Sequence, residues 1–318
     1  MNDRPVLPAY RDRSRVVRIA GLVMLLLGAG FGLLGPLEMY CFYLFSPGGR
    51  FAYEGFGFGS FMFGNIASQI AGYYMISALL LVLGYGHLRL RRWCRVVALA
   101  VVRCWQVLGA PLVVITFFVL LASKEIGWPA AIAAAVLLIF SYAVLPTLLL
   151  RFYRGQDLYC TLVAADPIPS RLESKPITIL VLCGLYGFYV VVLHLLILFN
   201  GIYPLPWGLR FGQQGIILLD MSIAWLALLT WGTWRQARWA WWGGAVWWGW
   251  FTLAVVVGLA RTSYSQLLVG LNLPPYEVGF VEGIPAQGWH LALFFGVPLT
   301  ATWGVVLAAR KHFRMVGG

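Results

Sequence analysis

Charge is scarce in this chain of 318 residues: only 11% of them are charged, and only 11 are Asp or Glu. Ordinary soluble domains carry about 25% charged residues. Hydrophobic residues make up 61%, and the mean hydropathy is +0.82. This composition excludes a soluble enzyme, a nucleic-acid-binding domain and a disordered protein. It predicts a multi-pass membrane protein, in which the net charge of +12 marks topology and not a nucleic-acid partner.

Motifs for catalysis and metal binding are also missing. The sequence contains no phosphate-binding GxxxxGK[ST] loop, no HExxH and no aspartate-rich pair of motifs. Its five cysteines show no CxxC or Cys/His metal spacing, and only Cys41 is expected near the external face, so no external disulfide is predicted. Of the four histidines, only His194 is expected to be buried, which disfavours bis-histidine haem. No cofactor and no metal is strongly implied.

Long apolar stretches define the fold. A membrane-spanning helix needs about 20 mostly apolar residues, and eight such stretches follow one another along the chain. They are placed at about 18–45, 60–86, 97–122, 128–150, 177–199, 211–233, 239–260 and 288–309. We therefore expect an all-α polytopic membrane protein with eight transmembrane helices. No connection is long enough for a separate soluble domain.

The distribution of basic residues supports this count. Of the 23 Lys and Arg residues, 19 lie in the terminal segments and in the second, fourth and sixth connections. The four on the other side are Arg50, Lys124, Arg210 and Arg261. Because Lys and Arg accumulate in cytoplasmic segments, both termini are predicted to lie on the cytoplasmic side of the cell membrane. The first apolar run is too long for a cleaved signal peptide and is interpreted as an uncleaved first helix.

Spaced motifs suggest that the chain consists of two halves, 1–153 and 154–318, with four helices each. Phe63-Gly64 and Gly84 match Phe211-Gly212 and Gly232 at one constant offset, and a two-residue gap then aligns Arg92-Trp93 with Arg238-Trp239. Chance is the alternative, because Gly, Trp and Phe are abundant. If the duplication is real, four helices per repeat give both halves the same orientation, and the repeats are parallel.

Polar residues inside the spans are the candidate functional site, because such groups are costly in the membrane and usually face protein or water. Glu38, His194 and Asp220 are expected at similar depths in the outer half of the membrane, by the helical rise of 1.5 Å per residue. Helices five and six are consecutive, so His194 and Asp220 are the favoured pair. A carboxyl group held by interhelical hydrogen bonds is the alternative to a proton, ion or substrate site.

Two further clusters have both a structural and a functional interpretation. Trp247, Trp248 and Trp250 are either packing residues or a flat aromatic surface for a quinone, carotenoid or other pigment. Four arginines of the second connection either anchor the topology or bind anionic lipid headgroups. They are Arg89, Arg91, Arg92 and Arg95.

The external loops at 47–59 and 262–287 contain many apolar residues and little charge. They are expected to cap the bundle or to contact other membrane subunits. The favoured function is therefore a non-catalytic subunit of a larger membrane complex, with contacts to membrane lipids and to lipid, quinone or pigment ligands. A small transporter or channel that uses Asp220 is the second hypothesis, and a lipid- or isoprenoid-modifying enzyme is the third.

Overall fold

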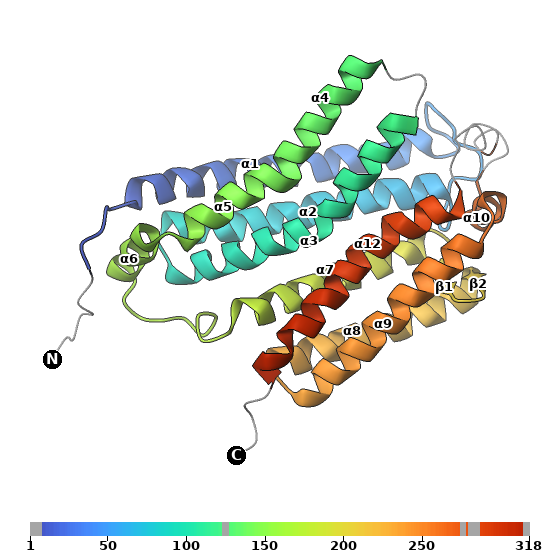
Figure 1. Ribbon diagram of the computed structural model, residues 1–318. Helices are drawn as coiled ribbons and strands as arrows, with labels where there is room; N and C mark the ends of the chain where they lie inside the picture. Colours follow the sequence, from blue (N-terminus) through green and yellow to red (C-terminus); the bar gives the residue numbers. More distant parts are fainter. Residues whose placement is uncertain (1–7, 123–126, 274–277, 279–286, 314–318) are drawn as a thin grey trace.

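The computed structural model describes residues 8–122, 127–273, 278 and 287–313 and forms an elongated bundle of helices (Figure 1). Seven of the described helices are long and apolar enough to cross a membrane. They are α1 (Ser14–Phe45), α2 (Phe61–Leu88), α4 with its continuation (Trp128–Arg154), α7 (Ile177–Leu198), α8 (Gly212–Trp234), α9 (Arg238–Arg261) and α12 with its final turn (Gly288–Phe313). The prediction of a helical membrane protein is confirmed at this level.

The predicted third span coincides with a further helix, α3 (Arg92–Ala122). Each of the eight predicted spans therefore coincides with a helix. Helix α3 is not among the seven helices named above as long and apolar enough to cross a membrane. Helix α1 begins, and α12 ends, at the same end of the bundle (Figure 1). We call this the terminal end, and the other the opposite end.

The fourth span is not a uniform α-helix. It consists of α4 (Trp128–Ile139), a π-helical turn η1 (Phe140–Val144) and α5 (Leu145–Arg154). Pro146 lies just after this turn. A proline ring inside a helix clashes with the carbonyl group four residues earlier, and a widened π turn relieves such a clash.

Short elements lie at both ends of the bundle. At the terminal end, α6 (Gln156–Ala165) follows α5, and at the opposite end α10 (Tyr264–Gly270) follows α9. Between α7 and α8, strands β1 (Tyr203–Leu205) and β2 (Gly208–Arg210) pair as an antiparallel hairpin. The sequence analysis did not predict this hairpin, because its strands have only three residues each.

The helices pack in pairs. Helix α1 packs on α2, α7 packs on α8, and α9 packs on α12, while α3 contacts α5, α7 and α12. The largest hydrophobic core is formed by α7, α8, α9 and α12. A second core joins α1, α2, α3, α5 and α6.

Glycine permits the close approach of α1 and α2. The buried residues Gly21, Gly28 and Gly35 recur every seven positions along α1. A Cβ atom at Gly21 would lie 2.8 Å from the backbone nitrogen of Leu88, and one at Gly84 would lie 2.9 Å from the carbonyl oxygen of Gly21. Small residues allow membrane helices to gain close van der Waals contact, since apolar burial gives little driving force inside lipid.

We expect Gly21→Ala to destabilise the protein, because the added methyl group forces α1 and α2 apart. Overpacking of this kind costs about 1–3 kcal/mol. The measurement is the thermal midpoint of the purified protein in detergent. Gly30→Ala is the matched control, since nothing lies within 4 Å of a Cβ atom at Gly30. An equal loss in both variants would contradict the importance of this contact.

Candidate functional site

The predicted intramembrane polar residues lie on the outside of the bundle. The side chains of His194 on α7 and Asp220 on α8 are exposed, and Glu38 on α1 is half-buried. His194 donates from Nδ1 to the carbonyl oxygen of Val190 in its own helix, at 2.7 Å. Within the described residues, no hydrogen bond or ion pair joins any two of the three predicted residues, and Asp220 has none at all.

The register of α7 and α8 places His194 and Asp220 at the same depth. The Cys183 thiol lies 3.8 Å from the carbonyl oxygen of Thr230, which fixes the register of these two antiparallel helices. His194 follows Cys183 by eleven residues, and Leu219 precedes Thr230 by eleven. Eleven residues are three helical turns plus roughly 20°, so His194 shares a face with Cys183 and lies level with Leu219 and Asp220.

Glu38 belongs to another part of the bundle. Its helix, α1, packs on α2, whereas the helices of His194 and Asp220 pack on each other. Asp220 lies ~12 Å from the start of α8, by the rise per residue. The structure thus supports the expected pairing of the two helices that carry His194 and Asp220, while the three-residue cluster stays a prediction.

The expectation that His194 is the buried histidine is wrong. His87 is the one in the interior, with 1% of its surface exposed. Its Nδ1 lies 2.7 Å from the carbonyl oxygen of Leu83, and its Nε2 lies 2.7 Å from the hydroxyl group of Tyr153 on α5. In the sequence, His87 lies beside a basic segment, which does not indicate a buried side chain. Its hydrogen-bond partner Tyr153 is distant in the chain, so this contact could not be predicted from the sequence.

The arginines of the second connection are largely engaged within the protein. Arg92 donates from Nε to Glu173 at 3.1 Å, and Arg91 lies 3.7 Å from Asp166. Arg95 donates from Nε to the carbonyl oxygen of Tyr153 at 2.8 Å. The guanidinium group of Arg89 stacks on the ring of Tyr85. Both acidic partners lie in the connection between α6 and α7.

We expect Glu173→Gln to destabilise the protein, because it removes the counter-charge of Arg92, whose side chain is only 12% exposed. Hydrogen bonds to charged groups contribute about 1.5–3 kcal/mol, so the thermal midpoint should fall clearly. Glu54→Gln is the matched control at an exposed residue. If the two variants have the same thermal midpoint, the Arg92–Glu173 ion pair does not contribute to the stability of the protein.

The three predicted tryptophans face different directions around α9. Trp248 is fully buried and contacts Tyr186 and Tyr189, with ring centroids 5.8 Å and 4.7 Å away. Trp247 is half-buried and stacks on Phe251 at 4.8 Å, and Trp250 is 47% exposed. Consecutive residues point about 100° apart in a helix, so the three rings form no single flat surface.

The predicted docking loops differ in what is described. In the loop at 47–59, Phe51 and Phe58 are 57% and 65% exposed, while Tyr53 is 6% exposed. Phe56 packs against Phe42 of α1 at 6.0 Å. In the loop at 262–287, positions 274–277 and 279–286 lie outside the described residues. Part of the first loop is therefore a cap on α1, and its contact with a partner stays a prediction.

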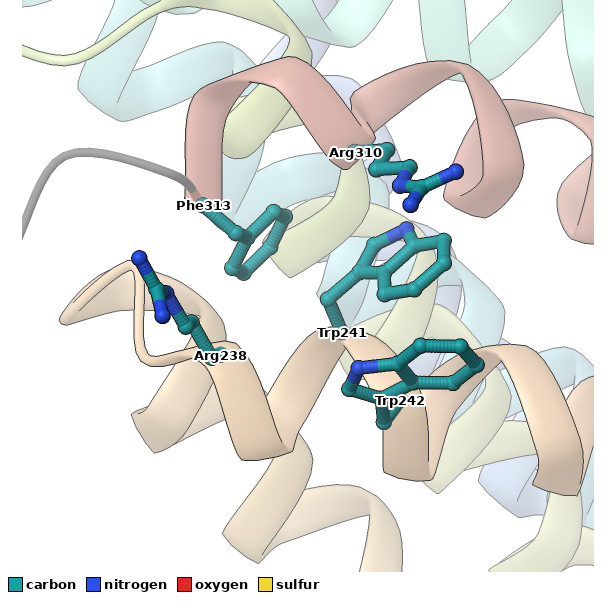
Figure 2. A pocket seen from close by; sticks show the side chains of 5 residues that line it. All are labelled: Arg238, Trp241, Trp242, Arg310 and Phe313. Carbon is teal, nitrogen blue, oxygen red and sulfur yellow. The ribbon is translucent and has the colours of Figure 1, made fainter.

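A pocket that the sequence analysis did not predict lies at the terminal end (Figure 2). It has a volume of about 330 Å³ and lies between the start of α9 and the final turn of α12. Its lining residues are Arg238, Trp241, Trp242, Arg310 and Phe313. The Arg-Trp-rich segment at the start of α9 is the part of this pocket that the sequence could have indicated. The second arginine of the pocket, Arg310, comes from the final turn after α12, which is distant in the chain.

A second cavity, of about 630 Å³, lies between α9 and α12 nearer the opposite end. Its walls are almost wholly apolar, with Thr300 as the one hydroxyl group among the lining residues. Asp220 and His194 line neither cavity. Within the described residues, no group of three His, Cys, Asp or Glu side chains is placed to hold a metal ion.

Comparison with known proteins does not assign the chain to a family. No protein-family model, no curated protein and no solved structure matches the chain.

Proposed function

We propose that the chain is a non-catalytic subunit of a larger membrane complex, and the exposed side chain of Asp220 carries the proposal. This carboxyl group projects from the outside of the bundle, well within an apolar helix. An Asp at the centre of a membrane helix costs about 2.5–3.5 kcal/mol on insertion scales, and such residues almost always face protein or water. A neighbouring subunit on this surface would supply the missing polar contact.

His194 strengthens the proposal. It lies at a similar depth on the adjacent helix and is also exposed, which is consistent with one partner that contacts both residues. Lipid tails cannot hydrogen-bond either group. A polar side chain of a partner helix can bind both, and interhelical hydrogen bonds of this kind are common inside membrane complexes.

Transport through the chain is the second hypothesis. It requires a polar passage that reaches Asp220, but neither of the two cavities described above contains this residue. A proton or ion pathway at Asp220 would have to run along the outer surface, between this protein and a partner. The subunit hypothesis is thus the simpler account of the same residue. The third hypothesis is a lipid- or isoprenoid-modifying enzyme.

Photo-crosslinking in native membranes tests the proposal. Ile217 lies one turn from Asp220 and is 52% exposed, so p-benzoylphenylalanine at this position should form a discrete adduct with another protein. Val246, 68% exposed on α9, is the control position and should give no such adduct. Asp220→Asn should reduce crosslinking from position 217. If position 217 yields no protein adduct, the subunit proposal fails.

The proposal includes eight spans. Both ends of the described chain lie at the terminal end, which requires an even number of crossings (Figure 1). The seven apolar helices and α3 together make eight. With the basic residues concentrated at the terminal end, this end faces the cytoplasm.

Cysteine labelling in intact cells tests this orientation. Val269→Cys, at a residue 75% exposed in α10, should react with a membrane-impermeant thiol reagent. Ile168→Cys, at a residue 79% exposed in the connection after α6, should react only after the membrane is permeabilised. The reverse pattern would show that the terminal end lies outside.

A duplication into halves 1–153 and 154–318 also forms part of the proposal, and its support lies in two turns. Leu90, between α2 and α3, has φ 50°, and Gln236, between α8 and α9, has φ 57°. The amide of Arg91 donates to the carbonyl oxygen of Gly86 at 2.8 Å, and that of Ala237 donates to Gly232 at 2.9 Å. These residues correspond at one offset, 146.

Side chains around the two turns follow the same offset. The ring of Trp93 lies against Gly86, and the ring of Trp239 lies against Gly232, each where a Cβ atom would clash. Arg89 stacks on Tyr85, and Arg235 stacks on Trp231. This alignment pairs Gly232 with Gly86 in place of Gly84, and it keeps Arg92-Trp93 opposite Arg238-Trp239. The helix pairs α1–α2 and α7–α8 would then be equivalent.

A further inference from the structure

Two arginines without an acidic partner among the described residues line the terminal-end pocket from opposite sides (Figure 2). Arg238 is the first residue of α9, and Arg310 lies in the 3₁₀ turn that follows α12. Figure 2 shows the side chain of Arg310 beside the ring of Trp241. The Arg310 guanidinium carbon lies 5.3 Å from the centroid of that ring. Within the described residues, neither arginine forms an ion pair. A cavity of about 330 Å³ falls within the usual size range of small-molecule sites, about 300–1,000 Å³.

Hydrogen bonds fix the walls of this pocket. The indole nitrogen of Trp241 donates to the carbonyl oxygen of Val306 at 2.9 Å, which joins α9 to α12. The side-chain amide of Gln236 donates to the carbonyl oxygen of His312 at 3.1 Å, which holds the 3₁₀ turn against the start of α9. Phe313 is 3% exposed and closes one side. The backbone at both arginines is thus fixed, while their side chains are exposed to a ligand.

The turn between α2 and α3 carries a similar charge, which is neutralised by another residue of the chain. Arg92 corresponds to Arg238 at the offset of 146, and it binds the carboxylate of Glu173. Between Lys175 and the end of the sequence, the acidic residues are Asp220, Glu277 and Glu282. Asp220 lies within α8, and Glu277 and Glu282 lie outside the described residues. Within the described residues, no acidic side chain forms an ion pair with Arg238.

We propose that the pocket of Arg238 and Arg310 binds a phosphate group, carried by an anionic membrane phospholipid. Arginine binds phosphate through paired, charge-assisted hydrogen bonds. The exposed rings beside the pocket favour a lipid as the source of the phosphate. Trp242 is 60% exposed and packs edge-on against Trp241 at 4.6 Å. Tryptophan favours the depth of the lipid headgroups, and basic pockets between helices at the cytoplasmic face bind such headgroups.

A titration of the full-length protein in neutral detergent tests the proposal. Phosphatidylglycerol, phosphatidylcholine and inorganic phosphate are added separately, and the thermal midpoint is followed. Phosphatidylglycerol should raise the midpoint, and phosphatidylcholine should not. In the double variant R238Q/R310Q the apparent affinity should fall at least about tenfold, since hydrogen bonds to charged groups contribute about 1.5–3 kcal/mol.

Matched controls separate the pocket from general basic charge. Arg235→Gln removes an arginine that stacks on Trp231 at the same end but outside the pocket, and it should keep the wild-type affinity. Trp242→Leu, at an exposed ring, should weaken the response to phosphatidylglycerol and provides a second variant that leaves the core intact.

Three results would overturn the inference. An absent response to phosphatidylglycerol in the wild-type protein, or equal losses in R238Q/R310Q and Arg235→Gln, would show that the pocket is not the site. An equally strong response to inorganic phosphate alone, lost in R238Q/R310Q, would assign the pocket to a soluble anion and remove the lipid. None of these results depends on the partner proposed for Asp220, whose test is crosslinking from position 217.

Discussion

A membrane-spanning chain must satisfy its polar groups internally, because lipid tails offer no hydrogen bonds. Most polar side chains in this bundle obey the constraint. Ser77 of α2 donates to the carbonyl oxygen of Gly28 in α1 at 2.7 Å, and Trp303 of α12 donates to Ala245 in α9 at 2.9 Å. Such bonds join the helix pairs on which the fold depends. Some polar groups do not obey the constraint: the indole nitrogen of Trp248 and the hydroxyl group of Thr252 are buried without a hydrogen-bond partner among the described residues. Asp220 carries a costlier group, an exposed carboxyl group with no partner among the described residues, and it is the reason to propose a second chain.

Charged side chains at the terminal end are also paired in part within the protein. Arg91 and Arg92 bind Asp166 and Glu173, which belong to the connection between α6 and α7. At the turn between α8 and α9, Arg238 forms no ion pair with an acidic side chain of the described residues. The turns between α2 and α3 and between α8 and α9 thus have similar backbones but differ in whether an acidic side chain pairs with their arginine. This difference leaves one pocket of the protein open to an anion from its surroundings.

The positions of the helices could be predicted from the sequence, because a helix must supply about 20 apolar residues to cross a membrane. The contacts between helices could not. The partners Arg92 and Glu173, or Trp241 and Arg310, are far apart in the chain, and hydropathy does not encode which faces meet. His194 was expected to be the buried histidine, yet its side chain is exposed and that of His87 is buried, since burial depends on the neighbouring helix. Of the candidate site, the positions of His194 and Asp220 along their helices follow from the helical rise, and their depth in a membrane stays a prediction.

The central claim is that another protein covers the surface of α7 and α8 around Asp220. The most direct measurement is an electron cryo-microscopy map of the protein extracted from its native membrane in a disc of its own lipids. The account predicts density for a helix of a second chain against this surface, with a polar side chain within hydrogen-bonding distance of Asp220. A map in which only lipid tails contact Asp220 and His194 would contradict it.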